Sequence, residues 1–286
     1  AADHLPVGSR TNLVEQLAAQ ERAVHEQALH LPERGDLGAQ LVGSVSLRDV
    51  GGQHAGGDRQ IVVEIARDVL LAEHVGSRLH VCHLSTRGSV EIVRWAKSRG
   101  INVTAEVTPH HLLLTDDLVR SYDPIFKVNP PLRSDDDVQA VREGLADGTI
   151  DIVATDHAPH PMEDKECEWS AAAFGMLGLE TALSVVQQTM VDTGLLTWAQ
   201  VAEKMSSKPA EIGRVHNQGR PLEVGEPANI VLVDPGATRL IDARDTASLS
   251  RNNPYAGLTL PGEVVATFLR GRPTVNDRTL VEAATV

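Results

Sequence analysis

Between residues 61 and 155 the chain alternates between segments with a helical period of apolar residues and short apolar segments typical of buried strands. We expect helices at 61–74, 89–98 and 135–145, and strands at 78–84, 102–108 and 149–155. Strands that alternate with helices at this spacing form βαβ units, in which the strands run parallel. The alternation therefore predicts an α/β protein built on a parallel sheet.

Polar side chains suited to metal or proton chemistry follow all three predicted strands. His83 ends the first, His110 and His111 follow the second, and Asp156 follows the third. In a barrel of alternating strands and helices, the carboxyl ends of the strands carry the active site. The pattern therefore predicts a metal centre at that edge. The alternative interpretations are a helix cap for Asp156 and structural roles for His110 and His111.

The two ends of the chain differ in composition and apolar pattern from the alternating region. Residues 1–60 contain no Phe, Trp or Tyr, and only 12–30 and, weakly, 37–50 have a helical pattern. Further helices are expected at 177–191, 198–205 and 209–215, and short strands at 230–233 and 264–269. We therefore divide the chain into a segment 1–60, a barrel-like domain 61–220 and a small β-rich accessory domain 221–286.

Composition excludes several classes of partner. A formal charge of −13 argues against nucleic acid and anionic membranes, although a site can still be locally positive for an anionic small substrate. Two cysteines cannot build a disulfide framework, which indicates a reducing, cytoplasmic environment. We find no apolar run of about 18 residues that would predict a membrane-spanning helix, and no secretory signal pattern.

Several longer motifs follow one another from about residue 61 onward. They are HVCHLST (80–86), AEVTPHHL (105–112), KVNPPLR (127–133), DIVATDHAPH (151–160), FGMLGLETALS (174–184), GRPLEVGEPANIVLVDP (219–235) and SRNNPYAG (250–257). In this order they closely resemble dihydroorotases of the bacterial class I type, within the amidohydrolase superfamily. The resemblance implies the C-terminal part of a (β/α)8 TIM barrel with a β-rich accessory domain, and a site that holds two zinc ions.

The resemblance also implies roles for individual residues. His83 matches a zinc ligand, and Asp156 matches a residue that is both a zinc ligand and the catalytic general base. The residues that match substrate-contacting positions are Asn129, His160, Phe174 and Gly175. No ligand role is carried over to His110 or His111.

The implied chemistry is the reversible conversion of N-carbamoyl-L-aspartate and (S)-dihydroorotate in pyrimidine synthesis. Opening a cyclic amide needs a strong nucleophile at neutral pH, and zinc lowers the pKa of bound water to about 7 and polarises the carbonyl. A carboxylate such as Asp156 can then move a proton to the leaving nitrogen. A homo-oligomer, or a pairing with aspartate carbamoyltransferase, is a further expectation.

The sequence departs from the family pattern before residue 61. The His-x-His pair of the first strand is absent, and no segment matches the bridging aspartate or carboxylated lysine of the fourth strand. His54, in a segment similar to the fifth-strand motif, and His30, at about the expected separation from His83, are the alternatives for the fifth-strand ligand. We therefore expect a dihydroorotase that is N-terminally incomplete, with residues 1–60 either disordered or translated out of frame.

Two other functions stay open on the sequence. One is a different cyclic amidohydrolase, such as an allantoinase or hydantoinase, which shares the metal site and differs in its substrate loops. The other is an inactive homologue that serves as a structural partner of aspartate carbamoyltransferase. Retention of both His83 and Asp156 favours an enzymatic ancestry over the second alternative.

Overall fold

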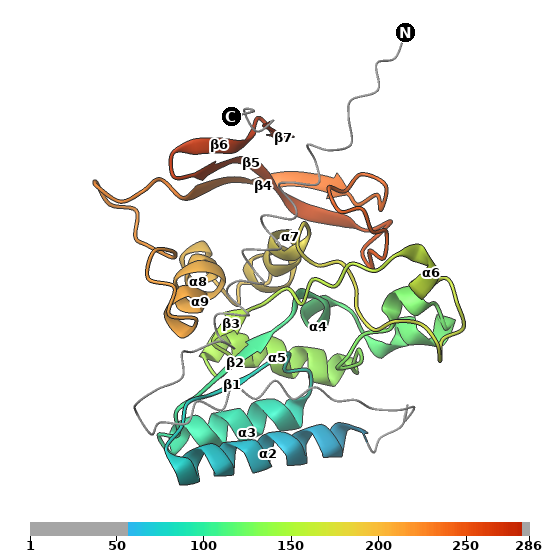
Figure 1. Cartoon of the computed structure of the whole chain (residues 1–286), viewed down its shortest axis with the longest axis vertical. Helices are drawn as coiled ribbons and strands as arrows, with labels where there is room; N and C mark the ends of the chain where they lie inside the picture. The colour runs from blue at the N-terminus through green and yellow to red at the C-terminus, as the bar shows by residue number, and fades with distance from the viewer. Residues whose placement is uncertain (1–56, 282–286) are drawn as a thin grey trace, which may run out of the picture.

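The computed structural model describes residues 57–281, which form a parallel sheet with its helices and a separate antiparallel sheet (Figure 1). The α-helices are α2 (Gly57–Val75), α3 (Arg87–Ser98), α4 (Pro109–Leu113), α5 (Asp135–Asp147), α6 (Met162–Lys165), α7 (Ala182–Val186), α8 (Trp198–Ala202) and α9 (Lys208–Ile212). The other helical segments are the 3-10 helices η1 (Asp116–Ser121) and η2 (Pro124–Phe126) and the π-helices η3 (Gln187–Val191) and η4 (Glu203–Ser207). The strands are β1 (Leu79–Val81), β2 (Val103–Val107), β3 (Ile152–Val153), β4 (Ile230–Leu240), β5 (Thr259–Leu269), β6 (Arg272–Asn276) and β7 (Thr279–Leu280).

The parallel sheet has the order β1-β2-β3, as the strand–helix alternation predicts. Leu79 pairs with Val103, and Val107 pairs with Val153. All three strands are shorter than the apolar runs from which they were predicted, because the chain leaves the ladder as it enters the loops that carry polar side chains. The helices expected at 12–30 and 37–50 lie outside the described residues.

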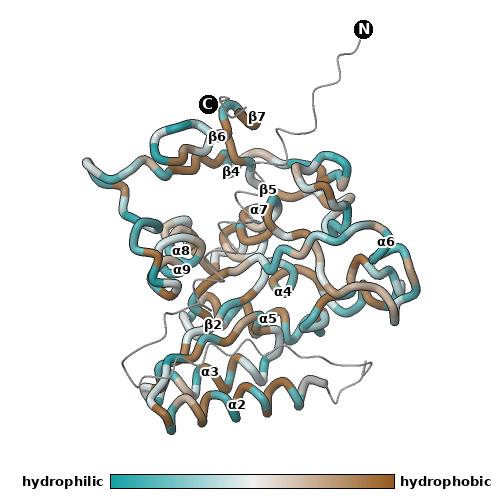
Figure 2. The backbone as a smooth tube through the Cα atoms, viewed as in Figure 1, coloured by the Kyte–Doolittle hydropathy of each residue, from teal (hydrophilic) through white to brown (hydrophobic). Residues whose placement is uncertain are grey.

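Helices α2 and α3 pack together on one side of the parallel sheet (Figure 1). On α2 the residues Ile61, Ile65 and Val69 recur at intervals of four and are all buried, and the alternation of polar and apolar residues is visible along both helices (Figure 2). Thr86 caps α3, since its hydroxyl accepts a hydrogen bond from the backbone N–H of Ser89. These features explain why the predicted helices form where they do.

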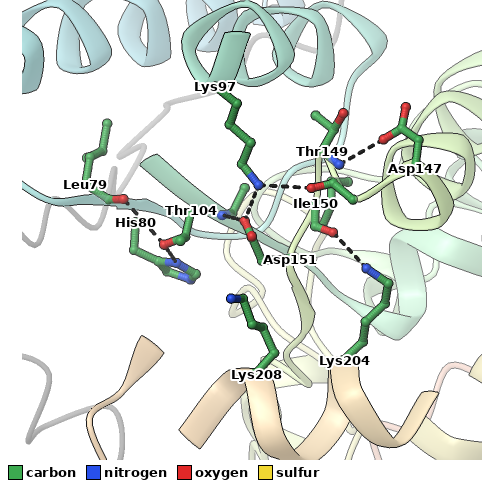
Figure 3. Close-up of polar contacts among 12 residues, drawn as sticks. Leu79, His80, Lys97, Thr104, Asp147, Thr149, Ile150, Asp151, Lys204 and Lys208 are labelled. Carbon is green, nitrogen blue, oxygen red and sulfur yellow. Dashed lines mark hydrogen bonds and ion pairs between the residues drawn. The ribbon is translucent and has the colours of Figure 1, made fainter. Parts of the chain in front are cut away.

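The polar links at the start of β3 fix the sheet against its helices (Figure 3). The ammonium of Lys97, on α3, donates to the Asp151 carboxylate at 2.7 Å, and the same carboxylate oxygen accepts from the backbone N–H of Ala105 at 2.8 Å. Lys204 Nζ, on η4, donates to the Ile150 carbonyl at 3.3 Å. The register of β3 beside β2 therefore rests on partly buried charge-assisted hydrogen bonds as well as on apolar packing.

Three predicted helices are wrong in their bounds. The helix expected at 177–191 begins only at Ala182 and continues as the π-helix η3. The backbone N–H groups of Gly178 and Leu179 donate instead to His157 in the loop that follows β3, and that of Leu177 donates to the Asn252 carbonyl. The pair expected at 198–205 and 209–215 is a continuous helical run of α8, η4 and α9 that ends at Ile212. The π-helical turn shifts the register where the sequence suggested a break.

The antiparallel sheet has the order β4-β5-β6-β7 and lies at the opposite end of the molecule from α2 and α3 (Figure 1). The strands predicted at 230–233 and 264–269 lie within β4 and β5, which are both longer. Helix α7 and η3 hold this sheet, since Ser184 Oγ donates to the Gly262 carbonyl and Gln187 Nε2 donates to the Pro235 carbonyl. Within the described range, no helix combines the length and apolar character needed to cross a membrane.

Candidate metal and catalytic site

His83 and Asp156 meet where β1 and β3 end, although 73 positions separate them in the sequence. His83 Nε2 lies 3.6 Å from Asp156 Oδ1, and both side chains are half-buried. Both residues have positive φ, 54° for His83 and 47° for Asp156. Such backbone strain in a residue other than glycine costs about 1–3 kcal/mol and is concentrated at functional sites. The two residues predicted to bind metal are therefore brought together, each in a strained conformation.

Glu106, near the carboxyl end of β2, connects the site to the sheet. Its Oε1 lies 2.8 Å from His83 Nδ1, although not in the alignment of a good hydrogen bond, and its Oε2 lies 3.0 Å from His80 Nε2. His80 Nδ1 in turn lies 2.7 Å from the Thr104 hydroxyl. Since Glu106 occupies the Nδ1 side of the His83 ring, Nε2 is the nitrogen that faces Asp156.

The charges of this group stabilise one another. Burial alone would lower the pKa of His83, but the neighbouring carboxylates of Glu106 and Asp156 raise it above its usual value. Burial alone would raise the pKa of Glu106, but its contacts with His80 and His83 hold it well below its usual value. Glu106 is therefore a buried carboxylate that stays ionised and holds two imidazoles.

Cys82 adds a thiol to the same group. One ligand atom each from His80, Cys82 and Glu106 lies within 4.8 Å of the others, which is a compact set of nitrogen, sulfur and oxygen donors. Burial, then the charges of Glu106 and Asp156, raises the pKa of Cys82, so the residue is a thiol and not a thiolate. This set lies directly beside His83, so it belongs to the same polar centre.

The two histidines after β2 differ in their surroundings. His111 is buried and fully paired, because Nδ1 lies 2.7 Å from the Thr108 hydroxyl and Nε2 donates to the Pro130 carbonyl at 3.1 Å. A structural role for His111 is therefore confirmed. His110 is equally buried, but neither ring nitrogen has a hydrogen-bond partner, so the structure gives it no satisfied structural role.

The predicted substrate residues His160, Phe174 and Gly175 also lie together. His160 Nε2 donates to the Phe174 carbonyl at 2.8 Å. Gly175 has a φ of 125°, and a Cβ at this position would lie 3.0 Å from His160 Nε2 and 2.5 Å from the Ala158 side chain. Asn252 joins the two loops, since its side-chain amide donates to the carbonyls of Ala158 and Gly175. The sequence resemblance alone assigned no role to Asn252.

Asn129, the remaining predicted substrate residue, is half-buried and directly precedes Pro130, whose carbonyl binds His111.

Sequence reasoning missed Glu106 and His80, although a carboxylate within the apolar run of β2 was a usable signal. It also missed Lys127 and Lys165, which hold the loop before Phe174. His30 and His54 lie outside the described residues.

Comparison with known proteins agrees with this geometry. Residues 53–274 match the model of the amidohydrolase family, so the chain belongs to that family. Metal dependence is typical of its members. The chain is 65% identical over 257 residues to a dihydroorotase of Streptomyces coelicolor, a match that covers 89% of the chain and 58% of the relative. It is 57% identical over 213 residues to a dihydroorotase of Mycobacterium tuberculosis, covering 74% of the chain and 50% of the relative.

Solved structures give the same fold. The L-hydantoinase (dihydropyrimidinase) of Arthrobacter aurescens superposes with a TM-score of 0.74 at 34% identity, over 79% of this chain and 51% of that one. A dihydropyrimidinase of Brevibacillus agri also gives 0.74, at 21% identity, which supports the fold alone. The chain thus spans about half the length of the curated relatives it matches.

Proposed function

We propose that this chain has the chemistry of a dihydroorotase, the reversible opening of dihydroorotate to N-carbamoyl-L-aspartate. The observation that carries the proposal is the pairing of His83 with Asp156 at the carboxyl edge of the parallel sheet, 3.6 Å apart. The high identity to the Streptomyces and Mycobacterium dihydroorotases supports this substrate class. The proposed division into segments 1–60, 61–220 and 221–286 remains part of this account.

Zinc is the metal that the family resemblance implies, and the residues present fit it. Two protein ligands on one tetrahedral zinc ion, each about 2.0–2.2 Å from it, lie about 3.4 Å apart, close to the 3.6 Å between His83 Nε2 and Asp156 Oδ1. Glu106 beside Nδ1 would orient the ring and strengthen its second nitrogen as a donor. When bound, zinc would supply polarisation of the scissile carbonyl and acidify the attacking water.

The protein groups have separate tasks in the proposed reaction. Asp156 takes the proton from the attacking water and returns it to the amide nitrogen as the ring C–N bond breaks, so that a carboxylate and a ureido group are formed. His160, Asn129 and the Phe174–Gly175 backbone bind and orient the ring and its carboxylate. Since Phe174 is 48% exposed, its ring can contact a ligand that enters from solvent.

The family resemblance implies further ligands for a two-zinc site. His30 or His54 is the proposed fifth-strand ligand, and the absence of a His-x-His sequence distinguishes the chain from the family pattern. We place the reaction in the cytoplasm, supported by the two free cysteines of the described region. A homo-oligomer or aspartate carbamoyltransferase is the proposed protein partner.

A second candidate function is hydantoinase or allantoinase chemistry, favoured by the similarity to the Arthrobacter L-hydantoinase. The test supplies zinc-loaded chain with dihydroorotate, hydantoin and allantoin and measures loss of each ring. Dihydroorotate turnover that Asp156→Asn abolishes and the exposed-carboxylate control Asp117→Asn retains would support the proposal. Turnover of hydantoin or allantoin alone would transfer it to the second candidate, and a folded, zinc-loaded chain inert toward all three would overturn both.

A further inference from the structure

Two buried lysines direct their ammonium groups into the loop that leads to Phe174 and Gly175. Lys127 is 6% exposed and Lys165 is 3% exposed. Lys127 Nζ donates to the carbonyls of Trp169, Ser170 and Ala172 at 2.7, 3.3 and 2.6 Å. Lys165 Nζ donates to the carbonyls of Ala173 and Gly175, both at 2.9 Å, and to that of Lys127 at 3.4 Å. All of these acceptors are backbone carbonyls.

The donors account for every carbonyl from residue 172 to residue 175. Lys127 donates to the carbonyl of Ala172, and Lys165 donates to those of Ala173 and Gly175. His160 donates to the carbonyl of Phe174, which lies between them. The backbone N–H of Gly175 donates back to the Lys127 carbonyl at 2.9 Å. Residues 173–175 belong to no helix or strand, so their backbone carbonyls take partners from side chains.

The same lysines also fix the side chain and the strain of this segment. Lys127 Nζ lies 4.4 Å from the centre of the Phe174 ring, a cation–π contact. The carbonyls of Gly175 and its neighbours are held while Gly175 keeps a φ of 125°, which only glycine adopts readily. Burial lowers the pKa of both lysines, and the neighbouring Lys127 also lowers that of Lys165. Holding these two like charges side by side in the interior is therefore unfavourable.

We propose that Lys127 and Lys165 are positioning residues of the ligand site, which set the Phe174–Gly175 peptide and through it the His160 imidazole. This inference rests on the proposed function, because it assumes that His160, Phe174 and Gly175 contact the ligand. Loss of the Lys127 ammonium leaves the carbonyls of Trp169, Ser170 and Ala172 without this donor and releases the Phe174 ring. Loss of the Lys165 ammonium removes the donor to the Ala173 carbonyl and leaves the Gly175 carbonyl with Asn252 alone. The ligand is then met by a loop of several conformations, and its affinity falls even where the zinc-binding residues are untouched.

The test compares Lys165→Met with Lys204→Met in the zinc-loaded chain. Lys204 is also buried, at 8% exposure, but its ammonium donates to the Ile150 carbonyl at the other end of β3 (Figure 3). Two measurements are made on each variant: the Kd for dihydroorotate by calorimetry, and amide hydrogen exchange resolved along the chain. In Lys165→Met we expect a Kd weakened by about tenfold or more, with faster exchange confined to residues 169–176. In Lys204→Met we expect neither change.

Equal affinities in the two variants, or faster exchange at 169–176 with no loss of affinity, would overturn the proposal. If Lys165→Met is destabilised throughout, Lys127→Met and Lys127→Arg replace it. Arginine keeps the charge and the donors, so Lys127→Arg should recover most of the affinity that Lys127→Met loses, and equal losses would refute the positioning role. If the wild-type chain binds no dihydroorotate, the proposed function fails. Separately, unchanged hydrogen exchange at 169–176 in Lys165→Met and Lys127→Met would refute the positioning role of the lysines.

Discussion

Acid should destabilise this protein through His111, a buried imidazole held in its neutral form. Its Nε2–H donates to the Pro130 carbonyl, which can only accept, and its Nδ1 accepts from the Thr108 hydroxyl. Burial and then the nearby Arg133 lower the pKa of His111 from 6.5 to about 3. Because the folded-state pKa lies below that of the unfolded chain, the unfolded state binds more protons between these two values. Stability contributed by His111 is therefore present above pH 6.5 and is lost as the pH falls toward 3.

The size of the effect follows from these pKa values. At pH 5 the unfolded imidazole is mostly protonated and the folded one is not, which lowers the free energy of unfolding by about 2 kcal/mol relative to pH 7. His111→Gln keeps a donor near the Pro130 carbonyl and removes the titrating group. We expect the wild-type protein to lose about 2 kcal/mol more than this variant between the two pH values.

Urea unfolding followed by circular dichroism measures the four free energies needed. Any constant cost of the substitution cancels, because only the change with pH is compared. His110 is present in both proteins, and the largest cause of its lowered pKa is burial, which the substitution leaves in place. An equal loss of stability in wild type and variant would refute the conclusion that His111 is buried in its neutral form.

Two further predictions concern the walls of the site. Gly175→Ala should lower the free energy of unfolding by about 2–6 kcal/mol, because the backbone strain and the contact with His160 add. Gly236→Ala, whose Cβ meets only a 3.6 Å contact, should be tolerated. Equal urea midpoints for the two variants would contradict this prediction. Glu106→Gln should weaken zinc binding by about 10–100-fold, because His83 loses the carboxylate that orients it. Competition with a chromophoric chelator measures the zinc affinity, and an unchanged affinity would contradict the orienting role of Glu106.

The sequence alone predicted the parallel sheet, because the apolar periods of 61–74, 89–98 and 135–145 are unambiguous and their caps are local features. Ser134 before three aspartates and Gly148 at a φ of 84° begin and end α5 where the pattern suggested. The bounds of the helix at 177–191 could not be predicted in the same way. Its first residues are held by His157 of the loop after β3, a contact across the fold that no local period records.

The candidate site was predictable to a similar extent. His83 and Asp156 were predicted because each follows an apolar strand, and their meeting follows from the parallel order of the strands. Glu106 was missed although a carboxylate within a strand was a usable signal, because its role depends on its contacts with His80 and His83, which the sequence does not record. Lys165 was missed because its acceptors are backbone carbonyls, which carry no sequence signal.

The most direct test of the account is the zinc content of the purified chain, measured by elemental analysis beside three variants. His83→Ala and Asp156→Asn each remove one of the paired donors, and His74→Ala removes an exposed histidine at the end of α2 as the matched control. The account predicts zinc in the wild-type chain and in His74→Ala, and a clear loss in the other two variants. Equal zinc in all four folded proteins, or none in any, would contradict the claim that His83 and Asp156 form a metal centre.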